Sequence, residues 1–206
     1  MDKIMVIGYY TLNTVYEEIS NKLIASLDKI PELDYNIVGI DSLGTWAKNT
    51  HIKAKVIRQF IEKYPDKKLL YVDVDAIIHS YPKLLDDLDC DIAVRYQDFK
   101  WRKNECLSGT VFINNTPNAK MLVDIWIDKN DKYISQDNNP RNWDQFNLDR
   151  AIKEFTDINL YVLPPEYTFI FDHMKRIYPN IKPIIEHFQA SRKVRGKSVS
   201  ILNKKR

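Results

Sequence analysis

Residues 69–78 constrain the fold more than any other stretch of the chain, because their sequence LLYVDVDAII places two acids inside an apolar run. A run of this kind predicts a buried strand in a sheet that is covered on both faces. Side chains alternate along a strand, so Asp73 and Asp75 are expected on one face. Two buried anions are costly unless a positive group lies between them. At the carboxyl end of an α/β strand, where ligands bind, we expect that group to be a divalent cation.

The same two residues also allow a simpler interpretation. One aspartate could cap the following turn while the other faces solvent at the end of the strand. Neither residue would then have a ligand.

The length of 206 residues suits one domain, 1–206. Within it we expect two halves (1–115 and 116–191) and a basic tail (192–206), in a chain that could be part of a longer protein. There is no apolar run near 18 residues and no signal-peptide pattern at the start, so a cytoplasmic protein without a transmembrane segment is expected. Cys90 and Cys106 match no metal-binding spacing and are expected to be free thiols.

The net charge of +3 is unevenly distributed. No acid follows Glu186, whereas seven bases lie between Arg192 and Arg206. The body is therefore acidic and the tail basic. Such a tail could contact phosphates, nucleic acid or a membrane face, or be a solvated chain end, and no aromatic-basic platform supports nucleic-acid binding.

Predicted strands and helices alternate along the chain, which indicates an α/β fold with a mostly parallel central sheet and helices on both faces. Strands are expected at 3–8, 35–40, 69–78, 91–95, 110–114, 159–163 and 184–187. Helices are expected from 13 or 14 to 30, at 50–64, from 82, from 116 to 126 and from 142 to 155.

Two polar segments separate these elements. Residues 96–109 are predicted to form a polar loop that is long enough to be functional. Residues 130–141 are predicted to be mobile. No GxGxxG or GxxxxGK[ST] motif is present, which argues against dinucleotide-binding and P-loop folds.

The ordered segments LLYVDVDAII, CLSGTVFINNTP, NWDQFNL and EHFQASR resemble the nucleotide-sugar glycosyltransferases of the GT-A fold, of the metal-dependent kind with an Asp-x-Asp motif. The chain lacks the His-x-Gly-x-x-Lys ending of the glycogenin-like branch. The resemblance implies transfer of a sugar from a nucleoside-diphosphate donor, with UDP-glucose the first expectation, to a glycan or another hydroxyl acceptor. It also makes 1–115 the nucleotide-sugar-binding half and 116–191 the acceptor or closing half. The 96–104 part of the polar loop, with Trp101, is then a candidate acceptor surface, because aromatic faces suit sugar rings. The oligomeric state, the acceptor and the stereochemistry stay open.

The resemblance also implies a metal site for Mn²⁺ or Mg²⁺. In the family pattern the second aspartate, here Asp75, binds the metal directly, and the first, Asp73, leans toward the ribose or a bound water. His187 matches the position of a third ligand, although a hydrogen-bonded core histidine is an equal alternative. His51, His79 and His173 have no such context, so surface or capping roles are expected for them.

For the donor, the resemblance implies contacts from the loop after the first strand, the SGT segment, the DQ helix start and the bases after the late histidine. A tyrosine of the loop could stack on the base, but core packing of Tyr9 is an equal alternative. Lys55 is expected to be solvated. The implied donor-binding residues are Gly8, Tyr9, Tyr10, Thr11, Asp73, Ser108, Gly109, Gln145, Arg192 and Lys193.

Asp144 is the candidate catalytic acid. It could deprotonate the acceptor in an inverting reaction, or hold the sugar and stabilise positive charge in a retaining one. As an acid at a helix N-terminus it would also be ordinary.

Two other functions are compatible with the aspartate pair. Haloacid-dehalogenase-like phosphatases place DxD at a strand end, but their motif lies near the N-terminus and is accompanied by a late acidic pair that is missing here. The second is a nucleotide-sugar-binding module without catalysis.

Overall fold

The computed structural model describes residues 4–100, 102–134 and 144–191. Its main sheet has the strand order β2-β1-β3-β6-β5-β7. Neighbouring strands are parallel except at β6, which is antiparallel to β3 and β5. The predicted α/β class with a mostly parallel sheet is therefore confirmed. The strands are β1 (Met5–Thr11), β2 (Asp34–Ile40), β3 (Leu69–Val72), β5 (Ile92–Phe99), β6 (Arg102–Ile113) and β7 (Leu160–Val162).

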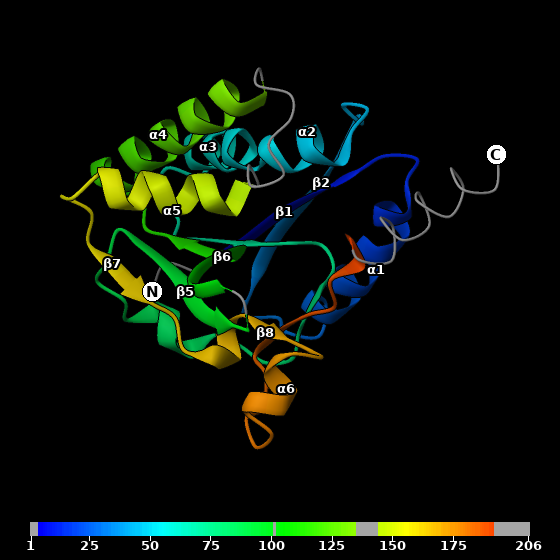
Figure 1. Ribbon diagram of the computed structural model, residues 1–206. Helices are drawn as coiled ribbons and strands as arrows, with labels where there is room; N and C mark the ends of the chain where they lie inside the picture. The colour runs from blue at the N-terminus through cyan, green and yellow to red at the C-terminus, as the bar shows by residue number, and fades with distance from the viewer. Residues whose placement is uncertain (1–3, 101, 135–143, 192–206) are drawn as a thin grey trace.

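Alternating side chains divide the core between the two faces of this sheet. Tyr71 and Val111 point into one layer, and their neighbours Leu70 and Phe112 point into the other. The first layer is covered by α3 (Lys53–Lys63), α4 (Pro117–Ile134) and α5 (Asp144–Glu154), which lie together on one side of the sheet in Figure 1. The second layer is covered by α1 (Val15–Leu27) and a smaller sheet.

The smaller sheet has the order β4-β9-β8 and is built from segments far apart in the sequence. Its strands are β4 (Ala76–Ile78), β8 (Phe169–Ile170) and β9 (Ile185–His187). The pairing of β4 with β9 sets Ala76 opposite His187, and so brings the late histidine beside the aspartate pair. The connecting elements are η1 (Lys83–Asp86), η2 (Pro165–Tyr167) and α6 (Met174–Ile177).

Local capping signals located two helices correctly. Thr14 caps α1 by accepting a hydrogen bond from the Tyr16 amide (3.2 Å), and Thr116 caps α4 by accepting one from the Ala119 amide (3.1 Å). The residue pattern of this helix predicts an apolar stripe of Val15, Ile19, Leu23 and Leu27, and the stripe is wrong at its first member, since Val15 is 46% exposed. The α4 helix also extends past the predicted end, into the segment that was expected to be mobile.

Two predicted elements are each divided in the structure. The helix expected at 50–64 is α2 (Trp46–His51) followed by α3, with a break at Ile52. The strand expected at 69–78 ends at Val72, and β4 belongs to the other sheet. Asp73 and Asp75 therefore lie in a turn between two strands, and not inside a strand.

The loop expected at 96–109 is a β-hairpin. Strands β5 and β6 stay paired as far as Phe99 and Arg102. The pairing of β3 with β6 ends earlier, at Val72 and Thr110. The hairpin thus projects beyond the carboxyl ends of β1 and β3. Trp101, residues 135–143 and the basic tail lie outside the described residues.

No helix in the described part of the chain has the length and apolar character needed to cross a membrane.

Candidate active site

A cavity of about 690 Å³ opens at the carboxyl ends of β1 and β3, the edge where ligands bind in open α/β sheets. It collects residues from both halves of the chain, because β9 and the start of α5 reach this edge beside β3. The sequence-predicted site residues that line it are Tyr9, Tyr10, Thr11, Asp73, Asp75, Ser108, Gly109, Asp144, Gln145 and His187.

Asp73 is held at the first position after β3. Its amide donates to the Gly109 carbonyl (2.8 Å), which adds one backbone bond to the β3–β6 ladder before the chain turns. The Tyr71 hydroxyl donates to Asp73 Oδ1 (2.8 Å). The side chain stays 37% exposed, so the second carboxylate oxygen is available to the cavity.

Asp75 anchors the segment that follows β9. Its carbonyl accepts from the Phe188 amide (2.9 Å), and its Oδ2 accepts from the Ala190 amide (2.7 Å). Asp75 thereby ties the end of β9, and with it His187, to the aspartate turn.

His187 is 4% exposed and its Nε2 lies 2.8 Å from the Thr110 hydroxyl. Burial lowers the pKa of His187 to about 4, so the imidazole is neutral at pH 7. When Thr110 accepts the Nε2 proton, Nδ1 carries a lone pair, as a metal ligand requires.

Gly109 leaves a small space between His187 and Asp73. A Cβ at this position would lie 3.3 Å from both His187 Nδ1 and Asp73 Oδ2, and 3.1 Å from His187 Cε1. The two ligand-type atoms thus face the same space. Among the described residues, no three His, Cys, Asp or Glu side chains converge enough to hold a metal by themselves. The pair fits a cation of the Mg²⁺ or Mn²⁺ type that takes its other ligands from phosphate oxygens.

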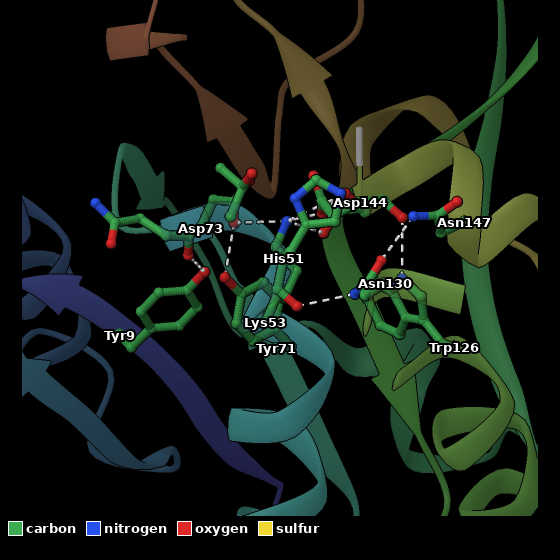
Figure 2. A network of polar contacts seen from close by, with 12 residues as sticks. Tyr9, His51, Lys53, Tyr71, Asp73, Trp126, Asn130, Asp144 and Asn147 are labelled. Atoms are coloured by element: carbon green, nitrogen blue, oxygen red, sulfur yellow. Dashed lines mark hydrogen bonds and ion pairs between the residues drawn. The ribbon is translucent and has the colours of Figure 1, made fainter. Parts of the chain in front are cut away.

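Lys53 is the functional residue that the sequence interpretation missed. It is 3% exposed, and its Nζ lies 2.8 Å from Asp144 Oδ2 and 3.1 Å from Asp73 Oδ1. It also donates to the carbonyl and the hydroxyl of Ser108, both at 3.1 Å. Burial alone would lower the pKa of Lys53, but Asp144 and Asp73 outweigh burial and raise it. Lys53 is therefore a fixed positive charge between the two acids (Figure 2).

The position of Lys53 in the sequence could have identified it as a buried lysine. It lies three, four and seven residues before Val56, Ile57 and Phe60, on the apolar stripe of α3. A lysine on a buried helix face needs a partner. Lys55, considered instead, is 45% exposed and pairs with Asp131 at the surface, so its predicted exposure is confirmed.

Asp144 begins α5 and is 5% exposed. Its Oδ2 accepts from the Ser108 hydroxyl (2.7 Å) as well as from Lys53, and its carbonyl accepts from Trp126 Nε1 (2.9 Å). Both donors occupy the same carboxylate oxygen. This arrangement suits an acid that holds a substrate group or stabilises positive charge better than it suits a free base.

A second polar network lies behind Asp144 and joins three helices (Figure 2). Asn147 of α5 donates to Asn130 of α4 (2.9 Å), and Asn130 donates to the carbonyl of His51 at the end of α2 (2.9 Å). His51 Nδ1 lies 2.5 Å from the Ala47 carbonyl within α2, and the ring is buried, so the predicted surface position is wrong.

The residues at the end of β1 have different surroundings. Gly8 is not among the cavity-lining residues; a Cβ there would lie 2.8 Å from the Val72 carbonyl, so close strand packing explains this glycine. Tyr9 is 9% exposed and donates to the Asn49 carbonyl (2.6 Å), as the core alternative predicted. Tyr10 is half-buried, and Thr11 Oγ1 lies 2.8 Å from Thr14 Oγ1.

The remaining sequence-predicted residues lie beside the cavity, at the surface or outside the described part of the chain. Gln145 donates to Glu105 Oε1 beside the cavity. His79 is exposed and pairs with Glu186 (2.9 Å), while His173 stacks on Phe99. Arg192 and Lys193 lie outside the described residues.

Comparison with known proteins gives structural matches only. No family model and no curated protein matches the chain. A glycosyltransferase involved in glycosylation of the major capsid of PBCV-1 matches with a TM-score of 0.67 and 14% identity, over 90% of this chain and 92% of that one. GlyE from Streptococcus pneumoniae TIGR4 gives 0.64 and 17%, over 91% and 55%. The galactosyltransferase LgtC, solved with donor and acceptor sugar analogues, gives 0.55 and 11%, over 90% and 87%.

The chain spans about half of the GlyE chain and nearly all of the other two. At sequence identities this low, the matches show a shared fold and do not extend to substrate or residue roles. The chain therefore has the GT-A fold of the nucleotide-sugar glycosyltransferases.

Proposed function

We propose that the protein is a metal-dependent glycosyltransferase that moves a sugar from a nucleoside-diphosphate donor, UDP-glucose being the first candidate, to the hydroxyl of a glycan or another acceptor. The observation that carries the proposal is the convergence of Asp73, His187 and the Lys53–Asp144 pair around one cavity in a fold of this kind.

The charge of the cavity supports a metal-bound diphosphate. Its described lining includes four acids, Asp73, Asp75, Glu105 and Asp144, against one lysine, Lys53. A diphosphate alone would be repelled by this excess of negative charge, whereas a divalent cation between them reverses the interaction. At this site Mn²⁺ or Mg²⁺ would neutralise the charge that develops on the leaving group.

The remaining residues fit roles in positioning. Asp73 and His187 would hold the cation through Oδ2 and Nδ1. Asp75, the direct metal ligand in the family pattern, has its Oδ2 bonded to the Ala190 amide and would instead keep His187 in place through its bonds to the 188–190 backbone. Lys53 and Ser108 orient Asp144, which would bind hydroxyls of the transferred sugar. Tyr10 and Thr11 border the end of the cavity where the nucleoside would lie.

The test is a thermal-shift titration with UDP and GDP, each with Mn²⁺ and with EDTA, followed by an assay of nucleotide release from UDP- and GDP-sugars. We expect at least one nucleotide to raise the melting temperature only when Mn²⁺ is present, because a ligand stabilises the state that binds it. Binding that is equally strong in EDTA, or no nucleotide binding at all, contradicts the proposal. Hydrolysis of phosphate monoesters without nucleotide binding would favour the phosphatase alternative.

Gly109→Ala tests the metal site without removing a ligand. The added methyl group would lie 3.3 Å from both Asp73 Oδ2 and His187 Nδ1, so we expect Mn²⁺ affinity, read by titration calorimetry with UDP present, to fall at least about tenfold. The control is Asp124→Ala, since Asp124 is 51% exposed on α4, away from the cavity. Unchanged affinity in Gly109→Ala would place the cation elsewhere.

A further inference from the structure

The two carboxylate oxygens of Asp73 have different surroundings. Oδ1 accepts a hydrogen bond from the Tyr71 hydroxyl (2.8 Å) and lies 3.1 Å from Lys53 Nζ. Oδ2 faces the space beside Gly109 into which His187 Nδ1 also points. A carboxylate oxygen accepts through two lone pairs, so the two donors occupy Oδ1 and leave Oδ2 to the cavity.

The Tyr71 hydroxyl is held in place by the packing of its ring. Tyr71 is 1% exposed in β3, and Lys53 Nζ lies 5.2 Å from the centroid of the ring. The ring of Tyr9 packs beside it, with the centroids 6.2 Å apart. The ring therefore keeps its hydroxyl aimed at Asp73, as the dashed lines of Figure 2 show.

The number of oxygens that one carboxylate offers affects which cation it suits. Ca²⁺ takes about six to eight oxygen ligands in a flexible geometry and often binds both oxygens of a carboxylate. Mg²⁺ demands a near-octahedral arrangement, which Mn²⁺ also adopts. Asp73, with Oδ1 occupied by Tyr71 and Lys53, offers one oxygen and so suits the octahedral cations.

We propose that Tyr71 is a positioning residue that sets the cation preference of the site, because it restricts Asp73 to one ligand oxygen and thereby favours Mn²⁺ or Mg²⁺ over Ca²⁺. The inference rests on the proposed function, since it concerns the cation of the donor site. It goes further in assigning the choice of cation to a residue that is not itself a ligand.

The test is titration calorimetry of Mn²⁺ and of Ca²⁺, with and without UDP, on the unaltered protein and on Tyr71→Phe. The variant lacks the hydroxyl but keeps the ring that packs on Lys53 and Tyr9. The unaltered protein should bind Mn²⁺ more tightly than Ca²⁺. In Tyr71→Phe, Mn²⁺ affinity should fall about tenfold, which is typical when a group that orients a metal ligand is lost. Ca²⁺ affinity should not fall, because Oδ1 gains a free lone pair and can serve as a second ligand.

Tyr81→Phe is the matched control. Tyr81 is a half-buried tyrosine whose hydroxyl donates to Asp86 Oδ1 (2.6 Å), and neither residue is among the described residues that line the cavity. This variant loses the same kind of bond, so both cation affinities should stay as they are in the unaltered protein. Free UDP binds each cation equally in all three titrations, and that contribution cancels in the comparison. A cooperative thermal melt in EDTA checks that each variant is folded.

The ratio of the two affinities separates positioning from a purely structural role. A loss of both affinities by the same factor in Tyr71→Phe, unchanged affinities, or equal binding of Mn²⁺ and Ca²⁺ by the unaltered protein overturns the inference and leaves metal-dependent donor binding intact. The expected change of ratio without UDP, in a protein that binds neither UDP nor GDP, supports the role of Tyr71 and removes the donor proposal. If Mn²⁺ does not bind with or without UDP, both proposals are wrong.

Discussion

Lys53 is the residue on which the charges of the site depend most. Replacing it by methionine keeps the apolar stem but leaves the 5%-exposed Asp144 without its cation. Removing one partner of a buried ion pair is costly, so we expect Lys53→Met to lower the free energy of unfolding by about 3 kcal/mol in urea melts. Lys55→Met, which breaks an exposed pair with Asp131, should cost less than about 1 kcal/mol. Equal effects in the two variants would show that Lys53 is not paired.

The buried neutral state of His187 predicts a dependence of stability on pH. Its pKa is about 4 in the folded protein and about 6.5 when unfolded, so between these values the unfolded state binds more protons. The contribution of His187 to the free energy of unfolding is therefore constant above pH 6.5. It decreases as the pH falls from 6.5 to 4, by about 3 kcal/mol in total. Asp73 raises and Lys53 lowers the pKa of His187, and loss of hydration raises the pKa of Asp73 and of Asp75.

Because the acids titrate too, the measurement is a comparison with His187→Gln, with both proteins in EDTA. The difference in unfolding free energy between them should shrink from pH 7 to pH 4 in chemical denaturation. A difference that stays constant over this range would mean that the His187 pKa is not lowered.

At the residue scale, the sequence predicted those site residues whose chemistry is unusual for their surroundings. Asp73 and Asp75 stand out because acids are rare within an apolar run, and they do line the cavity. Their partners were not predictable in the same way. Lys53 meets Asp144 only because β3 and β6 are neighbours in the sheet and α3 and α5 lie on the same face, and this order is a property of the whole fold.

At the scale of elements, local signals again succeeded where the cause is local. Thr14 and Thr116 bind amides two and three residues away, so the helix starts could be predicted from sequence. The β5–β6 hairpin could not. Its projecting part carries Gln97, Asp98 and Asn104, and it forms because the strands continue a pairing begun in the core, with no apolar alternation of its own.

The contact between Asn130 and Asn147 predicts energetic coupling between α4 and α5. Asn147→Ala leaves the buried Asn130 Oδ1 without its donor, so the unfolding free energy should fall by about 2 kcal/mol. Asn130→Ala should cost at least as much, since it also frees the His51 carbonyl. The double variant should cost less than the sum, as expected for partners in one network. Met121→Ala, at a 52%-exposed position on α4, is the control; additive effects of the two asparagine variants would exclude the coupling.

At the scale of the whole molecule, the expected halves 1–115 and 116–191 are interleaved. β7 pairs with β5 and β9 pairs with β4, so strands of the second half complete both sheets begun by the first. The two cores also share one sheet, since each strand of its centre sends alternate side chains into both. A core on one face cannot be lost while the other stays packed against the same strands. We therefore predict one cooperative unfolding transition for the described domain.

The two cysteines allow unfolding to be measured separately on each face of the sheet. Cys90 is buried in the core beneath α1, and Cys106 is buried in the core beneath α3, α4 and α5. Burial raises the pKa of Cys90 to about 11 and raises that of Cys106 as well, so neither thiol should react in the folded protein at pH 8.5. Short pulses of iodoacetamide across a urea gradient, read by mass spectrometry, should label both cysteines with the same midpoint. If labelling of one cysteine began at a lower urea concentration, that face of the sheet would be unfolding first, and the chain would contain two units of stability instead of one.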